Sequence, residues 1–286
     1  MTSFCFITTS IVLLPCYSPW DERAQEYQVG LRLCRIERRI SGLQEIVTLQ
    51  LPRLHADIFS AISIQPSRCP DKMEKPFFPS SHSSLIRILW RTEGEASSSS
   101  SDDDSNGSGP IIRSFDIFMQ SATLLHLARS QVEGGPPIPW HAWGPRNTRL
   151  QSNASNAHPP RQHRVFAGNR YVRMYRNIPS MISVLDFTPG RWTWGDELPS
   201  RPNSSSLMQG SQIIVGRNSP TVISCREIFE EDTVTTSLPF SQVHRDVGFP
   251  LRGDLEGLIL CDDERIVLIE VRTHQFQWFF HSLECG

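Results

Sequence analysis

The stretch LILCDDERIVLI, residues 258–269, decides the fold class of this 286-residue chain. It contains two runs that are almost entirely apolar and rich in β-branched residues, separated by the acidic triplet Asp262, Asp263 and Glu264. Two such runs joined by a three-residue polar turn are typical of an antiparallel β-hairpin that lies inside the fold. We interpret the three acids as a solvated turn, because catalysis by paired carboxylates requires two acids that face each other across a cleft.

The same pattern recurs along the chain, in short apolar runs bounded by Pro, Gly, Ser and Asn. The predicted strands are residues 4–14, 27–36, 45–51, 57–64, 84–90, 111–118, 163–166, 171–175, 181–187, 212–215, 221–228, 233–238, 256–261, 265–271 and 276–281. One short helix is predicted at 120–129, where Leu124, Leu125 and Leu127 follow Ser121 as a candidate N-cap. Exact repeats are absent. The prediction is a single all-β, mainly antiparallel domain over residues 1–286, either an incomplete or divergent β-propeller-like fold or a pair of packed sheets.

Residues 93–110 (EGEASSSSSDDDSNGSGP) differ from this pattern, because they contain no apolar residue beyond Ala96. Such a segment cannot offset the entropy that is lost on ordering, so it is predicted to be a disordered insertion. Ser99, Ser100 and Ser101 each have an acid three residues further on, which resembles the substrates of acidophilic kinases. They are candidate phosphorylation sites, with an unregulated linker as the alternative.

The net charge of only −2 gives no global argument for a nucleic-acid partner or a membrane surface. The seven cysteines are scattered and contain no Cys-x-x-Cys pair, which favours reduced, mostly buried thiols in a cytoplasmic or nuclear protein. The apolar segment 4–16 lacks a basic region and contains Thr8, Thr9 and Ser10. We interpret it as a buried strand and not as a signal peptide or membrane anchor.

The familiar catalytic motifs do not occur in the chain. It contains neither a Gly-x-Ser-x-Gly nucleophile turn nor a Gly-rich phosphate loop. A zinc site needs three or four His, Cys or carboxylate ligands, and the nearest candidates are His141, His158, His163, His281 and Cys285, which contain one close pair only. We therefore expect a protein that is not an enzyme and that has no metal and no cofactor.

The most suggestive stretch runs from residue 140 to residue 176. Between residues 134 and 176 the chain carries seven arginines and no acid. Arginine forks and aromatic faces together can bind an acidic or phosphorylated peptide, whereas nucleic acid is disfavoured by the low net charge. The candidate partner-binding residues are Trp140, Trp143, Arg146, Arg149, Arg173 and Arg176. The alternative is that the acidic last third of the chain neutralises these arginines.

A family resemblance rests on segments that follow one another in order: IVLLPCYSP, YQVGLRLCRI, EIVTLQLPRL, RSFDIFMQSATLLHLA, IPWHAWGPRNTRL, HRVFAGNRYVR, SVLDFTP, TTSLPFSQVHRDV and LILCDDERIVLIEV. The most specific element is Trp-x-x-Trp-Gly-Pro at residues 140–145, followed by Thr148 and Arg149. Together these segments resemble the long C-terminal region of F-box proteins from mushroom-forming fungi. The likeness covers nearly the whole chain, with the Ser/Asp loop as an insertion.

The resemblance implies a propeller-like β domain that recruits the partner of a cullin-type ubiquitin ligase. In that family an F-box docks onto the ligase linker protein, but no helix of the Leu-Pro-x-Glu-Leu-Leu type occurs in this sequence. We therefore expect a non-enzymatic protein-interaction domain that would meet the linker protein only if an F-box is encoded upstream. Two alternatives stay open: a secreted carbohydrate-active or carbohydrate-binding β protein with its site at residues 262–264, and a truncated gene product without activity.

Overall fold

The computed structural model describes residues 4–17, 28–37, 42–66, 84–94, 111–152, 164–174, 181–188, 212–215, 218–246, 258–261, 265–272 and 277–284. Antiparallel strands dominate these residues, which confirms a mainly antiparallel β structure. The chain divides into two compact units, where the sequence predicts a single domain. Unit 1 comprises residues 1–66, 86–157 and 220–238, and unit 2 comprises residues 67–85, 158–219 and 239–286.

Several predicted features lie outside the described residues. These are the candidate phosphorylation sites Ser99, Ser100 and Ser101, the candidate Arg176, the acids 262–264 and all but the first two residues of the insertion 93–110.

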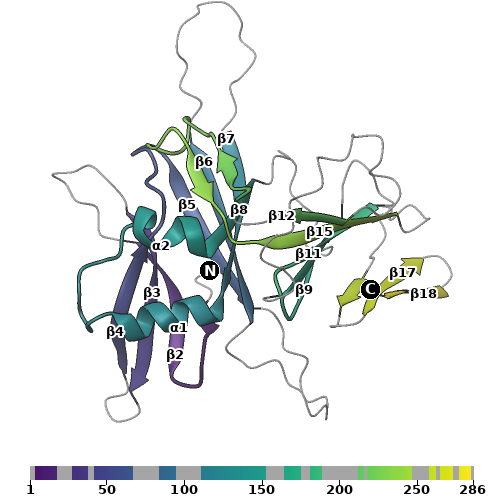
Figure 1. Cartoon of the computed structure of the whole chain (residues 1–286), viewed down its shortest axis with the longest axis horizontal. Helices are drawn as coiled ribbons and strands as arrows, with labels where there is room; N and C mark the ends of the chain where they lie inside the picture. Colours follow the sequence, from purple (N-terminus) through teal and green to yellow (C-terminus); the bar gives the residue numbers. More distant parts are fainter. Residues whose placement is uncertain are drawn as a thin grey trace, which may run out of the picture. The chain divides into compact units, whose positions relative to one another are not determined.

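Unit 1 contains two four-stranded sheets in which neighbouring strands follow one another along the chain (Figure 1). The first has the order β1-β2-β3-β4, with β1 at Cys5–Phe6, β2 at Ile11–Tyr17, β3 at Val29–Glu37 and β4 at Gly42–Gln50. The second has the order β5-β6-β7-β8, with β5 at Phe59–Pro66, β6 at Leu85–Gly94, β7 at Ile111–Gln120 and β8 at Thr148–Ser152. A hairpin of β13 at Thr221–Ile223 and β14 at Val234–Thr236 belongs to the same unit. Each four-stranded sheet is therefore an antiparallel meander.

The first predicted strand, residues 4–14, is two strands in the structure. The hydroxyl oxygen of Thr8 accepts hydrogen bonds from the backbone N–H of Ser10 at 3.2 Å and of Ile11 at 3.1 Å. The N–H of Ile7 also donates to the carbonyl of Ile11 at 2.9 Å. A threonine hydroxyl that bonds the backbone two or three residues on competes with the strand ladder. The chain therefore turns here, and the segments on either side pair with each other as β1 and β2.

The hydrophobic core of unit 1 draws its side chains from both sheets and from both helices. Within it Trp90 of β6 and Phe115 of β7 contact Phe229, with ring centroids 5.5 Å and 5.2 Å from that of Phe229. All three rings are buried. A buried aromatic side chain removes about 150–250 Å² from water, so Phe229 attaches the segment between β13 and β14 firmly to the second sheet.

The segment that carries Phe229 is a turn, although the sequence predicts a strand over 221–228. The strand ends at Ile223. The carbonyl of Cys225 then accepts hydrogen bonds from the N–H of Ile228 at 3.0 Å and of Phe229 at 2.9 Å, and the N–H of His55 donates to the carbonyl of Ile228 at 3.0 Å. Two donors on one carbonyl close the chain into a tight turn, which presents Ile228 and Phe229 to the core.

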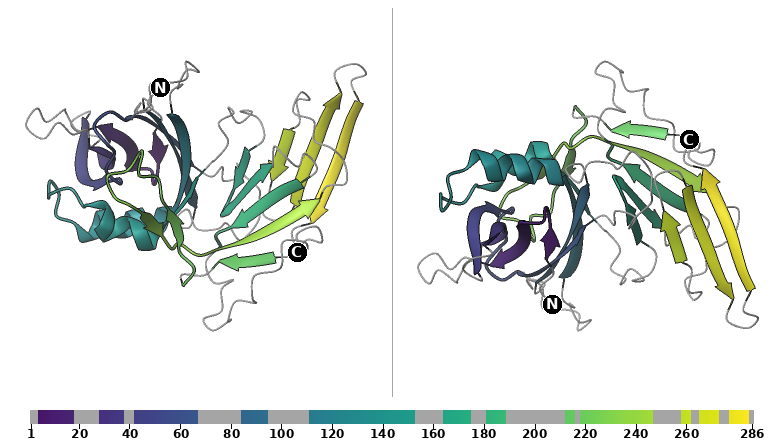
Figure 2. Two further views of the ribbon diagram at one scale, coloured as in Figure 1. Left: turned by 90° about the horizontal axis from the view of Figure 1, so that it is seen from above. Right: turned by 90° about the horizontal axis from the view of Figure 1, so that it is seen from below.

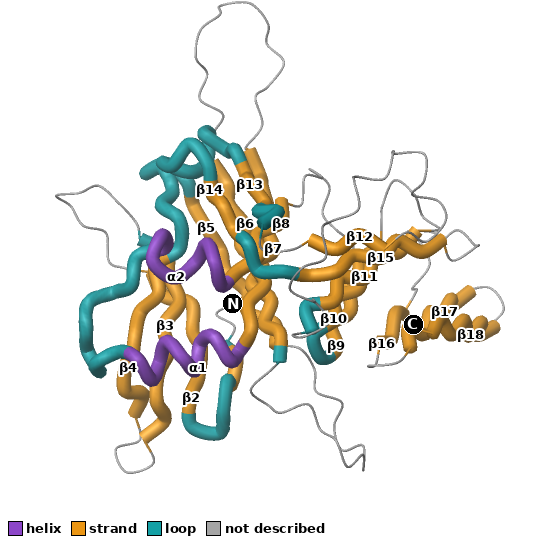
Figure 3. Tube along the Cα trace, in the orientation of Figure 1, coloured by secondary structure: helices purple, strands orange, loops and turns teal. Residues whose placement is uncertain are grey.

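The helices of unit 1 are α1 at Ser121–Ser130 and α2 at Trp140–Asn147, on one side of its strands (Figures 2 and 3). The predicted helix 120–129 is confirmed, but Ser121 is its first residue, and Gln120 holds the N-cap position without a side-chain cap. The sequence does not predict α2, because Gly144 and Pro145 are poor helix formers. Among the described residues, neither helix is long and apolar enough to cross a membrane.

Unit 2 contains a five-stranded sheet in the order β12-β15-β11-β10-β9 and a three-stranded sheet in the order β16-β17-β18. The strands of the larger sheet are β9 at Arg164–Ala167, β10 at Arg170–Met174, β11 at Met181–Asp186, β12 at Gln212–Val215 and β15 at Phe240–Asp246. Those of the smaller sheet are β16 at Leu258–Cys261, β17 at Arg265–Arg272 and β18 at Gln277–Glu284. The register pairs Leu258 with Ile269 and Cys261 with Ile266, which confirms the hairpin predicted from residues 258–269.

The larger sheet of unit 2 has a buried interior of its own. Tyr171, Ile182 and Leu185 are buried on its central strands. Next to them the rings of Phe187 and Phe240 stack with centroids 5.4 Å apart. The sheet therefore holds its central side chains, both apolar and polar, in fixed positions.

We predict that Phe229→Ala lowers the free energy of unfolding of unit 1 by about 3–5 kcal/mol, because it leaves a cavity beside two buried aromatic rings. Urea unfolding followed by tryptophan fluorescence would measure the change. Val222→Ala is the matched control: its side chain lies in the same hairpin and is 54% exposed, so its effect should stay within about 0.5 kcal/mol. Equal and small effects of the two substitutions would contradict the packing of Phe229.

Candidate functional site

Trp140 and Trp143, two of the candidate partner-binding residues, lie on the inner face of α2. Both side chains are buried, and their rings meet edge to face with centroids 5.2 Å apart. The indole N–H of Trp143 donates a hydrogen bond to the carbonyl of Gln50, at the end of β4, at 2.9 Å. Both rings belong to the core of unit 1, so they attach α2 to the first sheet and do not offer a surface to a partner.

Gly144 and Pro145 complete this attachment. A Cβ atom at position 144 would lie 2.3 Å from the ring of Trp140, so only glycine lets the ring pack this closely. The carbonyl of Pro145 accepts hydrogen bonds from the N–H of Ser237 at 2.7 Å and from its hydroxyl at 3.0 Å. The hydroxyl of Thr148 donates to the carbonyl of Gly144 at 2.7 Å. The C-terminal end of α2 is therefore joined both to β8 and to the segment that follows β14.

Arg149 is fully buried on β8. Its Nε atom donates to the carbonyl of Leu238 at 2.7 Å, and its Nη1 atom donates to the hydroxyl of Thr221 at 2.9 Å and to the carbonyl of Thr236 at 3.3 Å. Burial lowers the pKa of Arg149 to about 10, which leaves the guanidinium charged at neutral pH. Arg149 thus ties β8 to both strands of the β13–β14 hairpin.

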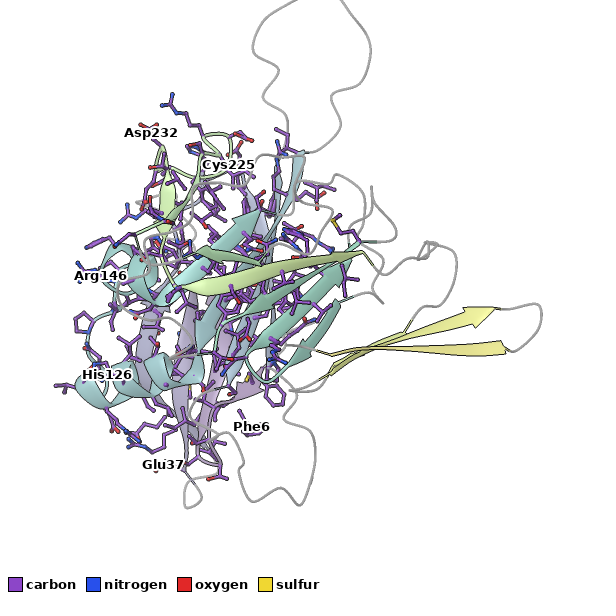
Figure 4. All side chains as sticks on the ribbon, turned by 45° about the vertical axis from the view of Figure 1, so that its right-hand side comes forward. Phe6, Glu37, His126, Arg146, Cys225 and Asp232 are labelled. Atoms are coloured by element: carbon purple, nitrogen blue, oxygen red, sulfur yellow. The ribbon has the colours of Figure 1, made fainter. Side chains whose placement is uncertain are left out.

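The six candidate residues consequently have different roles. Trp140, Trp143 and Arg149 lie in the interior, which corrects the prediction that they contact a partner in the folded chain. The physical reason is packing and hydrogen bonding: the rings of Trp140 and Trp143 belong to the core of unit 1, and the donors of Arg149 find their acceptors on the β13–β14 hairpin and at Leu238. Arg146 is exposed in the last turn of α2, where Figure 4 shows it pointing away from the strands.

Four exposed basic or titratable side chains remain on the outer faces of the two helices, and we call them the helical surface: His126 and Arg129 of α1, and His141 and Arg146 of α2. Neither helix contains an acid. Figure 4 shows that His126, like Arg146, points away from the core. The period of the predicted helix 120–129 could have identified the first two. The other half of the surface depends on α2, which the sequence does not predict.

Glu133 is the acid in the segment that connects the two helices. It forms an ion pair with Arg35 of β3, and it accepts a hydrogen bond from the side-chain amide of Gln44 of β4 at 2.9 Å. These contacts direct the carboxylate toward the first sheet. The helical surface therefore keeps its basic character.

Arg173, a further candidate, belongs to unit 2 and is half-buried on β10. The strand register places it opposite Ser183 of β11, which in turn lies opposite His244 of β15. The pKa of His244 is lowered from its ordinary value of 6.5, first by burial and second by the positive charge of Arg173. Arg173 thus forms part of a polar row on a sheet and is not one of the helical residues.

The neighbouring Arg170 agrees with the alternative prediction, in which acids from the last third of the chain neutralise the arginines. Its Nε atom lies 3.2 Å from Oδ2 of Asp186, directly across from it on β11, and both side chains are buried. The carboxylate also accepts a hydrogen bond from the N–H of Thr188 at 2.9 Å. A buried arginine with these partners is structural, so it does not add to a binding surface.

The described cysteines do not have the environment of a nucleophile. Cys5, Cys16, Cys34 and Cys225 are free thiols. Burial raises the pKa of Cys5 to about 11, and it is also the main cause that raises the pKa of the other three. The reactive thiolate is therefore scarce at neutral pH. Within the described ranges no three His, Cys, Asp or Glu side chains gather as metal ligands, and His158, His163 and Cys285 lie outside those ranges.

Arg149→Ala should lower the free energy of unfolding by about 2–4 kcal/mol, because it leaves buried backbone carbonyls without their donor. Arg149→Lys should recover little, since one ammonium cannot reproduce the donor geometry of the fork. Arg146→Ala is the matched control three residues away, and its exposed side chain should contribute less than about 0.5 kcal/mol. Chemical denaturation measures all three variants; equal losses at positions 146 and 149 would refute the structural role.

His244 generates a prediction about pH. Because its pKa is lower in the folded than in the unfolded chain, the unfolded chain binds more protons between the folded pKa and about 6.5. Stability due to His244 is complete above that window and is lost as the pH falls through it. Urea unfolding between pH 7.5 and pH 5 should therefore show a smaller loss of stability in His244→Gln than in the unchanged protein. A pH profile for His244→Gln identical to that of the unchanged protein would contradict the prediction.

Comparisons of the chain with models of protein families, with curated proteins and with solved structures found no match in any of the three.

Proposed function

We propose that this chain is a non-enzymatic protein-interaction domain that binds an acidic partner protein through the helical surface. The observation that carries the proposal is that one face of α2 is packed in the core while another face is exposed. Its inner face is fixed by Trp140 and Trp143 and their buried contacts, whereas His141 and Arg146 are exposed. A helix of eight residues with a glycine and a proline would not be stable alone, so its presence depends on this buried support.

The charge of the helical surface supports an acidic partner. Arg129 and Arg146 are permanent cations, and an arginine fork can bind a carboxylate or phosphate with two parallel hydrogen bonds. Both occupy the last turn of their helix, where the helix dipole already favours a cation. With Glu133 held by Arg35, the net potential of the surface attracts an acidic segment and repels a basic one.

Rigidity supports binding in a second way. A partner that binds a preformed surface loses less conformational freedom with it than with a loop that must become ordered. The tryptophan pair and the hydrogen bond from Trp143 to Gln50 hold α2 in one position before any partner arrives. The surface can therefore act as a fixed template for a partner segment.

We further propose that the chain is related to the substrate-recruiting region of F-box ubiquitin-ligase adaptors of mushroom-forming fungi, with a divergent propeller-like fold. The two consecutive four-stranded meanders of unit 1 support this proposal, because a propeller blade is a four-stranded antiparallel sheet. The motif that carries the resemblance supports it too. Most of its specified residues, Trp140, Trp143, Gly144, Thr148 and Arg149, are buried and Pro145 is half-buried, whereas an unspecified position such as His141 is exposed.

The test is affinity capture from a lysate of a mushroom-forming fungus with the full chain as bait. The double charge reversal Arg129→Glu and Arg146→Glu should remove the captured partners, because it replaces both permanent cations of the helical surface with acids. The matched control is Arg91→Glu, the same change at an exposed position of β6 in the same unit. It should retain the partners.

Thermal unfolding of each bait must show that it is folded, and raising the salt concentration should weaken the specific capture, since screening acts on exposed charges. Retention of the same partners by the double variant would exclude the helical surface as the binding site. Loss of the partners from the Arg91→Glu bait as well would show that overall charge, and not this surface, decides the capture.

A further inference from the structure

The first sheet of unit 1 has two faces, and its inner face belongs to the core of that unit. Leu13 of β2 and Leu31 and Leu33 of β3 are buried there, together with side chains of both helices. Successive residues of a strand point to opposite faces of a sheet. Val12 of β2 and Arg32 of β3 therefore lie on the other face, which we call the outer face.

The cross-strand register joins all four strands on the outer face. Directly opposite residues of antiparallel strands project to the same face, with Cβ atoms about 4.5–5.5 Å apart. A row of such residues runs from Phe6 of β1 through Val12 and Cys34 to Glu45 of β4. Val12 and Cys34 are each 3% exposed, so the middle of this row is closely packed.

Exposed apolar side chains occupy both edges of the outer face. Phe6 is 59% exposed and Phe4, two residues before it, is 55% exposed, and their rings meet edge to face with centroids 5.5 Å apart. At the other edge Leu43 of β4 is 55% exposed, opposite the half-buried Ile36 of β3. Leu14 of β2, between the edges, is half-buried. Contiguous exposed apolar surface of this kind marks a protein contact.

The charges of the outer face cancel each other. The Nε atom of Arg32 lies 2.9 Å from Oε2 of Glu45, and both side chains are partly exposed, at 43% and 39%. The hydroxyl of Thr48 donates a hydrogen bond to Oε1 of Glu45 at 2.7 Å. Among the described side chains of the outer face, Arg32 and Glu45 are the charged ones. The face therefore favours neither a strongly acidic nor a strongly basic partner.

The size of the outer face suits a dimer of modest affinity. Strands about 4.7–4.9 Å apart, with a rise of about 3.3 Å per residue, give this sheet a flat area of about 450 Å². Two copies stacked face to face would bury about 900 Å² before the relief of the side chains is counted, which is close to the minimum of about 1,000 Å² for a specific interface. Sheets pack in this way about 10 Å apart, with interdigitated side chains.

We propose that the outer face of the first sheet binds the same face of a second copy of this chain, in a symmetric dimer. A two-fold interface brings the same patch of both copies together, so the patch must be complementary to itself. The outer face meets this requirement, because its apolar edges flank one pair of opposite charges. The dimer does not depend on the proposed function, since both helices pack against the inner face.

The experiment is sedimentation velocity of the full chain across the micromolar concentration range, in which the unchanged chain should pass from monomer to dimer. Phe6→Glu should raise the dissociation constant of the dimer at least about tenfold, because it places an unpaired charge in an apolar interface. Phe59→Glu is the matched control, the same change at a phenylalanine of the second sheet that is 75% exposed. It should leave the dissociation constant unchanged.

A charge exchange identifies a second copy as the occupant of the face. Arg32→Glu gives the outer face two acids, and Glu45→Arg gives it two cations. Each variant alone should therefore repel its own copies and dissociate at least about tenfold more readily than the unchanged chain. An equimolar mixture of the two variants should regain the dimer, because the two faces then carry opposite net charges.

A chain that stays monomeric throughout the concentration range would overturn the proposal, and so would an equal loss of the dimer in Phe6→Glu and Phe59→Glu. Thermal unfolding shows whether each variant is folded. If both charge variants melt cooperatively and their mixture still does not associate, the outer face is not the contact. The result is independent of the capture experiment, because Arg129 and Arg146 are intact in all these variants.

Discussion

The buried guanidinium of Arg149 is the interaction on which the rest of unit 1 depends. It ties the last strand of the second sheet to a hairpin that is separated from it in sequence by residues 158–219 of unit 2. Desolvation lowers its pKa to about 10, but the charge persists at neutral pH because the donors find buried oxygens. Only arginine offers several donors in a rigid plane at this distance from the backbone. Residues 140–150 therefore connect the first sheet, the second sheet and the β13–β14 hairpin of unit 1.

These buried contacts explain how a short helix that contains a glycine and a proline is stable in the folded chain. In α2 the residues that pack in the core, Trp140, Trp143 and Gly144, differ from those that are exposed to solvent, such as His141 and Arg146. Substitutions at His141 or Arg146 would change the proposed binding surface without disturbing the core, whereas Gly144 cannot accept a side chain beside Trp140.

Sequence patterns predict the strands well and the site poorly. Every predicted run overlaps an observed strand, because apolar periodicity is a local property of strands. The sequence does not predict β8, and it does not predict β15 because five of its seven residues are polar. It also misses the turn at Thr8, where a hydroxyl displaces the strand ladder. The burial of Arg149 could not be predicted, since arginine is mostly exposed and only tertiary contacts reveal its acceptors. The cross-strand row at Ser183 depends likewise on register.

The discontinuity of unit 1 affects how the protein is made. Its first two sheets are complete by residue 157, but the ring of Phe229 that fills their core and the acceptors of Arg149 arrive only with residues 220–238. During synthesis the ribosome must translate the whole segment 158–219 before the core of unit 1 can be completed. For this interval the nascent chain exposes apolar surface and Arg149 lacks its acceptors on the hairpin, so a chaperone that shields emerging β-strands would shorten the period in which the chain can aggregate.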